Sequence, residues 1–411
     1  MNLSFFISKR IVKNEARSFS RLIVIIARIA IALSLAVMII SSAMVDGFRE
    51  TIAGNIYGFW GHINIAKESL RNGYDDLPID RNAEFIENVY AIPGIEHING
   101  YARKAGIIKT KTDIEGIILK GVGTDFNWDS FQKYIVGGNR FIAGDTVPSN
   151  GLVISKSTSD RLKIGLGDSV ILHFIDQDAN GDYQQRFRKL YINGIYKTGL
   201  EEFDKLFALA DIKHIQKLND WSSEQVGGYE VFIDDVDKLD LLAEKVDQVA
   251  DPFWDVQSIR QLIPSIFDWL NLQKINERII LALMIIVALI NMITSLLILI
   301  LERTNMIGIL KALGATNWTI RKIFLSNAGY IVLWGMFWGN VIGVLICIVQ
   351  KEFGILKLPE QSYYVSVAPV SLDLWWIILM NAGTFVICMS ALLVPSILVS
   401  KIQPVKAIRF N

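Results

Sequence analysis

Four long runs of apolar residues dominate the hydrophobic pattern of this chain. They are Leu22–Val45, Ile279–Leu301, Ile323–Val349 and Leu374–Val399. Each run has at least the roughly 20 residues that a helix needs to cross a hydrocarbon core about 30 Å thick. The first run exceeds the apolar region of a secretory signal peptide, which is about 7–15 residues long, so a membrane span is favoured over a cleaved leader. The pattern therefore predicts four transmembrane helices.

These spans separate a membrane part from one large domain. We predict an α-helical membrane protein in which an α+β domain of two subdomains, residues 46–277, is inserted between the first and second spans. The other segments, in chain order, are an amphipathic segment at 1–20, spans at 21–45 and 278–301, a loop at 302–322, a span at 323–350, a short loop at 351–373, a span at 374–399 and a tail at 400–411.

Inside residues 46–277, short patterns of strand and helix type alternate. The pair Pro93-Gly94 ends a predicted helix at Ala83–Ile92, and a second helix is predicted at Asp237–Val249. Alternating apolar residues predict five strands, at Ala105–Lys109, Gly116–Lys120, Leu152–Ser155, Ser169–Phe174 and Arg188–Ile195. The polar run Asp176–Asp182 joins the last two strands, so we expect a solvent-exposed hairpin tip there.

Lys and Arg residues near the spans set the expected orientation. Residues 1–21 carry five of them, the loop at 302–322 carries four and the tail carries three, whereas the loop at 351–373 carries two. Cytosolic segments are enriched in these cations. We therefore predict cytosolic termini, a cytosolic loop at 302–322 and an extracytoplasmic domain. The formal net charge of zero gives no indication of a nucleic acid partner.

The sequence does not indicate a metal site, a disulfide or a nucleotide-binding site. Cys347 and Cys388 both fall inside predicted spans, so the domain is expected to rely on its core without disulfides. The histidines are scattered and are interpreted as surface or core residues: His62, His97, His173 and His214. Since the chain lacks a GxxxxGK[ST] phosphate-binding motif, we expect no ATPase activity and no cofactor of its own.

Small and polar residues inside the spans predict how the helices pack. Gly335, Gly339 and Gly343 repeat at every fourth position, which predicts a close contact either within the bundle or across a dimer. Four asparagines are expected to hydrogen-bond between helices, with an ion pathway as the alternative: Asn291, Asn327, Asn340 and Asn381. Arg28 lies about two turns from the cytosolic edge, where its long side chain can reach the head groups.

The loop at 302–322 contains a short predicted helix with an apolar stripe. Four apolar residues fall at helical spacing on one face: Met306, Ile309, Leu310 and Leu313. Gly314 supplies a stop for this helix, and Thr316 can cap the span that follows. A helix of about ten residues is marginal alone in water, so the stripe needs a cover. The cover is either the lipid head groups or a groove on a cytosolic protein.

The segment Glu302–Phe324, with the sequence ERTNMIGILKALGATNWTIRKIF, resembles the coupling-helix signature of the FtsX/MacB-type ABC permeases. Glu302-Arg303, Ile307-Gly308 and Leu310–Ala315 match that signature, and the tail Pro404–Arg409 is similar to the C-terminal pattern of the same superfamily. Met306 departs from it, because the family usually has an acidic residue before Ile307. The resemblance implies contact with a separate ABC ATPase through Glu302, Arg303, Met306, Gly308, Leu310, Lys311, Leu313 and Gly314.

A narrower resemblance covers most of the remaining chain. Met38–Phe48, Gly194–Asp204 and Val226–Val231 are similar to segments of the lipoprotein-releasing permeases of the LolC/LolE family. This resemblance implies an inner-membrane permease subunit that extracts lipoproteins from the outer leaflet and passes them to a periplasmic carrier. The implied partners are a cytosolic ABC ATPase dimer that binds the ATP, a second permease (identical or homologous), the lipoprotein, the carrier and membrane lipid. The alternative is a related MacB/FtsX-like permease that exports small molecules or peptides, or that controls cell-wall hydrolases.

Two further sites are implied by the narrower resemblance. A lipid anchor needs an apolar cavity open to the outer leaflet, which we expect at the outer ends of the first two spans, with the lining Ser41, Val45, Phe48, Leu281, Ile285 and Ile286. A hairpin that grips the carrier would correspond to residues 174–188, with contacts from Phe174, Gln184, Arg186 and Arg188. Because the proline-containing loop expected in such a hairpin is missing, a plain structural hairpin is the alternative.

Overall fold

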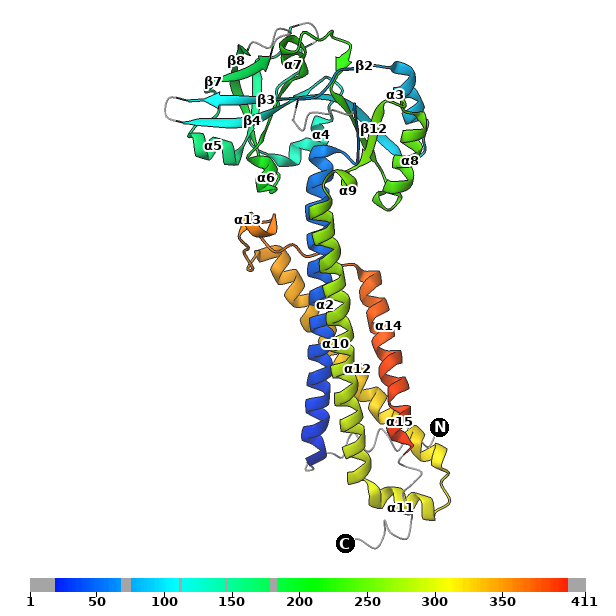
Figure 1. Cartoon of the computed structure of the whole chain (residues 1–411). Helices are drawn as coiled ribbons and strands as arrows, with labels where there is room; N and C mark the ends of the chain where they lie inside the picture. The colour runs from blue at the N-terminus through cyan, green and yellow to red at the C-terminus, as the bar shows by residue number, and fades with distance from the viewer. Residues whose placement is uncertain (1–18, 68–74, 111–112, 145–146, 178–182, 398–411) are drawn as a thin grey trace. The chain divides into compact units, whose positions relative to one another are not determined.

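The computed structural model describes residues 19–67, 75–110, 113–144, 147–177 and 183–397 (Figure 1). Residues 1–18 of the predicted amphipathic segment, residues 178–182 of the predicted hairpin tip and the predicted tail at 400–411 lie outside these residues. The chain divides into two compact units. The first contains the residues up to Glu50, Leu270–Lys357 and the residues from Val367 onward, and the second contains Thr51–Trp269 with Leu358–Ser366.

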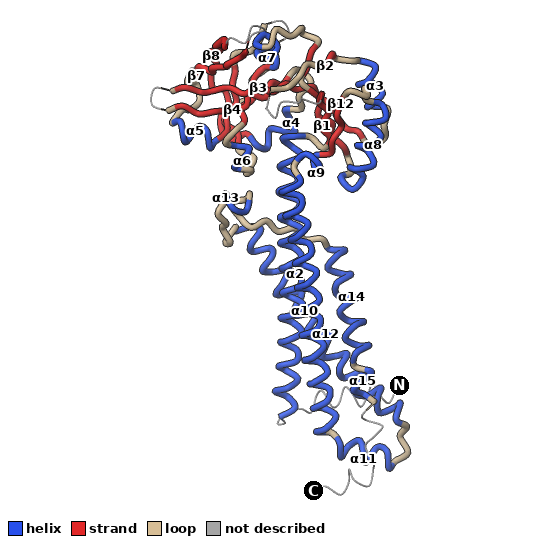
Figure 2. Tube along the Cα trace, viewed as in Figure 1, coloured by secondary structure: helices blue, strands red, loops and turns tan. Residues whose placement is uncertain are grey.

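The first unit is helical. Its elements are α2 (Phe19–Trp60), α10 (Pro264–Glu302), α11 (Thr304–Ala312), α12 (Asn317–Phe353), α14 (Leu374–Ala391) and α15 (Leu393–Ser396). Within the described ranges, four helical stretches are long and apolar enough to cross a membrane: Leu22–Trp60, Pro264–Glu302, Asn317–Phe353 and Leu374–Ser396. Two of these helices, α2 and α10, run without a break into the second unit (Figure 2). Both extend beyond the predicted spans because their polar flanks are compatible with a helix.

Helices α2 and α12 pack closely through the predicted glycine face. A Cβ atom added at Gly339 would lie 2.8 Å from the carbonyl oxygen of Ala32, and one at Gly335 would lie 2.8 Å from Cβ of Ile31. Gly343 meets α2 one turn further along, opposite Ala36. In a bilayer, close backbone approach gains dispersion energy that larger residues would prevent. The glycine face therefore makes a contact within the chain, which was one of the two predicted alternatives.

A reciprocal amide pair joins α12 to α14. The Nδ2 of Asn340 donates to Oδ1 of Asn381 at 2.8 Å, and the Nδ2 of Asn381 donates to Oδ1 of Asn340 at 2.9 Å. Each amide also donates to the carbonyl one turn earlier on its own helix. The prediction of hydrogen bonds between helices is confirmed for these two asparagines.

The second unit is built on one ten-stranded mixed sheet in the order β12-β1-β11-β3-β4-β9-β6-β8-β5, with β7 paired to β3 and β8. Its strands are β1 (Ile63–Lys67), β3 (Ile95–Lys109), β4 (Ile114–Val122), β5 (Ile135–Gly138), β6 (Gly151–Ser155), β7 (Ser169–Gln177), β8 (Tyr183–Tyr196), β9 (Phe207–Asp211), β11 (Gly228–Ile233) and β12 (Trp254–Ser258). A separate two-stranded sheet pairs β2 (Ile79–Asp80) with β10 (Gln225–Val226). The predicted number of subdomains stays a prediction.

Short helices accompany the strands of this unit. They are α3 (Ala83–Tyr90), α4 (Trp128–Phe131), α5 (Lys156–Leu162), α6 (Glu201–Asp204), α7 (Ile212–Leu218), α8 (Leu239–Val249) and α9 (Ile259–Leu262). The unit also includes α13 (Glu360–Tyr363), which lies between α12 and α14 in the sequence. The Nζ of Lys197 pairs with Oε2 of Glu360 at 3.0 Å, so the loop that was predicted only as a short connection contacts the large domain.

The glycine face generates the first testable prediction. Gly339→Leu should destabilise the helical unit by about 1–3 kcal/mol, because the side chain would overlap the backbone of α2. Gly383→Leu on α14 is the matched control, since a Cβ atom there meets nothing within 4 Å. Both changes raise helix propensity equally, so the difference in their thermal unfolding midpoints in detergent isolates the packing term. Equal midpoints for the two variants would refute the contact.

Candidate functional site

The short helix α11 is closed at both ends by local sequence features. At its start, the hydroxyl of Thr304 donates to the carbonyl of Leu301 at 2.6 Å, next to the break between α10 and α11. At its end, Gly314 takes a positive φ of 89°, a conformation that favours glycine. The Oγ1 of Thr316 then accepts from the backbone N–H of Thr319 at 3.2 Å and caps α12. The predicted helix, stop and cap are all confirmed.

The apolar residues of α11 do not form the single stripe that we predicted. Ile307 is fully buried, and Met306 and Leu310 are half-buried against the core of the helical unit. Ile309 and Leu313 lie one turn apart on the outer side, where 49% and 79% of their surface is exposed. The helix therefore has an inner face that packs on the spans and a separate outer face. We call Ile309 and Leu313 the outer pair.

This division changes the list of residues that can reach a partner. Glu302, Leu313 and Gly314 are exposed, and Arg303 and Lys311 are half-exposed. Gly308 is buried, so this expected contact residue is corrected to a packing residue. Met306 and Leu310 are half-buried against the core of the helical unit, and their contact with an ATPase stays a prediction. Sequence reasoning left Ile309 out of the contact set and missed Trp318, which is exposed at the first turn of α12. An aromatic side chain in a polar loop was the available signal for Trp318.

The hairpin of β7 and β8 also differs from its predicted contact set. Phe174 is fully buried, and its ring occupies the space beside Gly106 on β3, so this residue is corrected from a carrier contact to a core residue. Arg186 pairs with Asp220 at 2.8 Å and donates to the carbonyl of Leu218 at 2.6 Å. Burial, with a smaller effect of the nearby Arg186, lowers the pKa of Arg188. Gln184 is exposed.

The other face of this hairpin carries an exposed apolar stripe. Its members are Ile171, Ile175, Phe187 and Tyr191, which we call the hairpin stripe. Phe187 is 66% exposed and lies opposite His173, between Ile171 and Ile175 along the neighbouring strand. The stripe results from strict alternation in β7, where the inward residues are buried while Ile171 and Ile175 point out. That alternation was visible in the sequence, but its apolar outer face was not recognised.

The six residues predicted to line a lipid-anchor cavity are spread over α2 and α10. Ser41, Val45 and Phe48 are half-buried, and Leu281 and Ile285 pack against the core of the helical unit. Ile286 is exposed. The structure shows a small hollow of about 10 Å³ nearby, lined by α2 and by the start of α14, and none of the six residues lines it. The cavity stays a prediction.

Polar contacts link three helices at this end of the spans. The Nζ of Lys274 on α10 lies 2.8 Å from Oδ1 of Asp46 on α2 and 3.0 Å from Oε2 of the buried Glu277. The indole Nε1 of Trp376 on α14 donates to the hydroxyl of Ser42 at 2.8 Å. The Asp46–Lys274 and Ser42–Trp376 contacts join residues more than 200 positions apart, so no local pattern in the sequence could reveal them.

The segment Gly194–Asp204, which carried the narrower resemblance, is a tightly hydrogen-bonded loop. Asp204 accepts from the hydroxyl of Thr198 at 2.6 Å and from its backbone N–H at 3.1 Å. Gly199 follows with a positive φ of 86°. Burial raises the pKa of Asp204 to about 6, and the hydrogen bonds from Thr198 oppose that shift. These hydrogen bonds therefore fix the backbone conformation of the loop.

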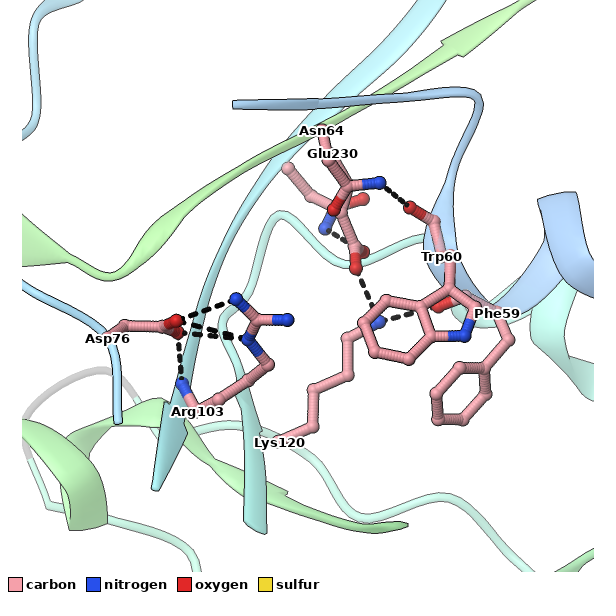
Figure 3. A network of polar contacts seen from close by, with 8 residues as sticks. Phe59, Trp60, Asn64, Asp76, Arg103, Lys120 and Glu230 are labelled. Carbon is pink, nitrogen blue, oxygen red and sulfur yellow. Dashed lines mark hydrogen bonds and ion pairs between the residues drawn. The ribbon is translucent and has the colours of Figure 1, made fainter. Parts of the chain in front are cut away.

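A buried ion pair holds the end of α2 inside the large domain (Figure 3). The Nζ of Lys120 on β4 lies 2.6 Å from Oε1 of Glu230 on β11 and donates to the carbonyl of Phe59 at 2.6 Å. Lys120 and Glu230 are each only 1% exposed. The Nδ2 of Asn64 donates to the carbonyl of Trp60, which satisfies a second carbonyl of the last turn. Burial lowers the pKa of Lys120, and the Glu230 carboxylate opposes that shift.

The Lys120 ammonium is placed where a helix needs a cation. The last carbonyls of a helix have no partner within it and carry the negative end of its dipole. Asn99 completes the site, because its Nδ2 donates to the other carboxylate oxygen of Glu230 at 3.2 Å. Beside this network, Arg103 forms an ion pair with Asp76 at 2.8 Å (Figure 3). No metal site competes with this explanation, since the described residues contain no cluster of three potential metal ligands.

Comparisons with known proteins agree with this architecture. The MacB-like periplasmic core domain matches residues 24–249, and the FtsX-like permease C-terminal domain matches residues 278–404. The chain is 24% identical to the lipoprotein-releasing system transmembrane protein LolC of Neisseria meningitidis, with 100% of both chains covered. It is 22% identical to the LolC protein of Xylella fastidiosa and 22% identical to the LolE protein of Haemophilus influenzae, with at least 99% of every chain covered.

The chain belongs to the LolC/LolE family of the FtsX/MacB-type permeases. Like other members of this family, it is an integral, multi-pass membrane protein. Among solved structures, the periplasmic region of MacB from Actinobacillus actinomycetemcomitans is 13% identical, with 49% of this chain and 92% of that chain covered and a TM-score of 0.34. The extracellular domain of the transporter YknZ is also 13% identical, with 48% and 99% covered and a TM-score of 0.33.

The buried ion pair leads to a prediction about this family member. Lys120→Met should destabilise the protein by about 3–5 kcal/mol, because Glu230 would be left buried without a counter-charge. Adding Glu230→Gln should restore much of the loss, since no uncompensated charge then remains. Lys156→Met, which removes a solvent-exposed ion pair with Asp160, is the control and should cost less than about 1 kcal/mol. Thermal unfolding of the three variants measures this, and a wild-type midpoint for Lys120→Met would contradict the assignment.

Proposed function

We propose that this chain is the membrane permease subunit of an ABC transporter that extracts lipoproteins from the outer leaflet of the bacterial inner membrane and passes them to a periplasmic carrier. The proposal rests on one observation above all: the chain is similar over its full length to proteins named as transmembrane components of a lipoprotein-releasing system. The energy would come from ATP hydrolysed by a separate cytosolic subunit, since the sequence has no GxxxxGK[ST] motif.

The geometry of α11 supports coupling to such an ATPase. Its inner face packs on the spans, so a push on the helix would reach the spans directly. Its outer pair, Ile309 and Leu313, is the kind of apolar contact that a groove on a partner protein accepts. The distribution of Lys and Arg supports a cytosolic position for this loop and for both termini. The partner that covers the outer pair would be one subunit of an ATPase dimer.

The large domain and the adjoining ends of α2 and α10 would act on the lipoprotein and the carrier. Helices α2 and α10 are continuous from the membrane unit into the large domain, so they offer a path for movement between the two. The large domain, inserted between α2 and α10, would lie in the periplasm. The contact between Asp46 and Lys274 joins these two helices at the end that would face the periplasm. A triacylated anchor entering between α2 and α10 would separate that pair. A second permease, identical or homologous, would complete the cavity.

The hairpin stripe is the surface that best fits a carrier. Ile171, Ile175, Phe187 and Tyr191 are exposed on one face of the hairpin, and their cross-strand partners on that face are the polar residues Lys189, Gln185, His173 and Ser169. Fully desolvated aromatic and aliphatic side chains at the centre of an interface usually supply most of its binding energy. We therefore place the carrier on this stripe, which replaces the set headed by the buried Phe174.

The decisive test of the function is depletion in the bacterium that encodes the chain. Lipoproteins destined for the outer membrane should accumulate in the inner membrane as the permease disappears. A plasmid copy with Leu313→Asp should fail to restore their localisation and should no longer co-purify the ATPase, because a buried charge would face the partner groove. Ile355→Asp, at an exposed isoleucine in the loop after α12, is the matched control and should restore both.

Two outcomes of this experiment would count against the proposal. Lipoproteins that stay correctly localised after depletion would exclude lipoprotein release and favour export or cell-wall control by a permease of the same superfamily. Retained ATPase binding by Leu313→Asp, with normal complementation, would show that the outer pair is not the coupling contact.

Carrier docking has its own prediction. Phe187→Glu should weaken binding of the purified carrier by about tenfold or more, because it puts a charge at the centre of the apolar stripe. Leu241→Glu, at an exposed leucine on α8, is the control and should leave the affinity unchanged. Titration calorimetry with the detergent-solubilised chain measures both, and equal affinities for the two variants would exclude the stripe as the docking surface.

A further inference from the structure

A hollow with an apolar lining lies between α2 and α12, on a part of the bundle that the proposed function does not use. Its volume is about 300 Å³, at the lower end of the range for ligand pockets. On the α2 side it is lined by Ile29, Ala32, Leu33 and Ala36, and on the α12 side by Trp338 and Ile342. Ile29 and Leu33 are more than half exposed, so the hollow opens to whatever surrounds the helices.

One cation, Arg28, lies at the end of this hollow. Its guanidinium lies over the ring of Tyr330, 5.6 Å from the ring centre. Among the described residues, its buried Nε has no hydrogen-bond partner. Arginine inside a membrane span is costly unless its charge is paired or reaches the head groups. The ring of Tyr330 stabilises the charge in part, but it cannot accept hydrogen bonds from all the N–H groups of the guanidinium.

The length and the lining of the hollow are complementary to an amphiphilic molecule. Arg28 and Ala36 are eight positions apart on one helix, which corresponds to about 12 Å along its axis. The charge is at the end nearer the start of α2, and the remainder of the lining is hydrocarbon. The small side chains of Ala32 and Ala36 leave space in the hollow, and Trp338 and Ile342 line it on the α12 side. A molecule with a charged head group and a hydrocarbon chain would therefore fit, with its head at Arg28 and its chain along the apolar lining.

We propose that this hollow binds an anionic phospholipid, with its phosphate on Arg28 and one acyl chain along Ala32 and Ala36. Charge complementarity favours this occupant, because a phosphate carries the opposite charge and supplies the acceptor oxygen that the Nε of Arg28 lacks. Basic pockets between transmembrane helices on the cytosolic side are typical sites for anionic head groups. An apolar helix of a second permease in the same place would leave the guanidinium unpaired. The leaflet, but not the site itself, depends on the proposed orientation.

The test compares lipids retained by the full-length chain. The purified protein is equilibrated with mixed micelles containing equal amounts of phosphatidylglycerol and phosphatidylcholine, and bound lipids are counted by native mass spectrometry. The wild type should retain phosphatidylglycerol about fivefold more than phosphatidylcholine. Arg28→Gln should bring the ratio close to one, and Arg28→Lys should keep most of the preference. Arg49→Gln, at an exposed arginine on the same helix, is the control and should leave the ratio unchanged.

A second pair of variants tests the groove apart from the charge. Ile29→Trp should fill the hollow and reduce retention of both lipids, whereas Ile26→Trp, at an exposed isoleucine outside the lining, should not. The proposal is overturned if Arg28→Gln keeps the wild-type ratio or if Ile29→Trp retains lipid normally. It is also overturned if Leu33→Cys cross-links to a second polypeptide in the lipid-containing micelles, because protein would then occupy the hollow. Thermal midpoints near the wild-type value identify the variants as folded.

Discussion

A bilayer provides no hydrogen-bond partner for a backbone, and most of this structure follows from that constraint. Four apolar stretches satisfy their backbone groups internally as helices, and the connections between them carry the polar residues. Since hydrocarbon gives no hydrophobic driving force between helices, the bundle depends on close packing and on a few polar contacts. Gly335, Gly339 and Gly343 supply the packing, and the Asn340–Asn381 pair supplies a polar contact. Arg28 adds a charge to α2, and its buried Nε has no hydrogen-bond partner among the described residues.

The large domain is stabilised by different physics. Water surrounds it, so its ten-stranded sheet buries apolar side chains in the ordinary way. At one point the domain also buries an ion pair, where Lys120 and Glu230 meet the last turn of α2. Such a pair adds little stability compared with apolar residues in its place. Removing one partner is strongly destabilising, because the other charge is then buried without a counter-charge. The ion pair lies where the end of α2 meets the sheet of the domain. There Lys120 and Asn64 donate hydrogen bonds to the carbonyls of Phe59 and Trp60.

Local features of the sequence predicted the parts of this structure that are local. The spans, the α11 helix, its Gly314 stop and the Thr316 cap depend on neighbours within a few residues, and all four were found. The same is true of the β7–β8 hairpin. The errors concern which side of an element faces the remainder of the protein. Leu310 and Leu313 have the same hydrophobicity, yet only one packs on the spans, and periodicity alone could not distinguish them. The Lys120–Glu230 and Asp46–Lys274 contacts join distant positions, so no window of the sequence contains them.

The central claim is that α11 and the hairpin lie on opposite sides of the membrane, and labelling of single cysteines tests it most directly. Cys347 and Cys388 are both buried, so the native background should be low. In intact spheroplasts, a membrane-impermeant maleimide should label Phe187→Cys and leave Leu313→Cys unmodified until the membrane is permeabilised. Labelling of Leu313→Cys in intact spheroplasts at the rate of Phe187→Cys would place α11 outside the cell and contradict the coupling scheme.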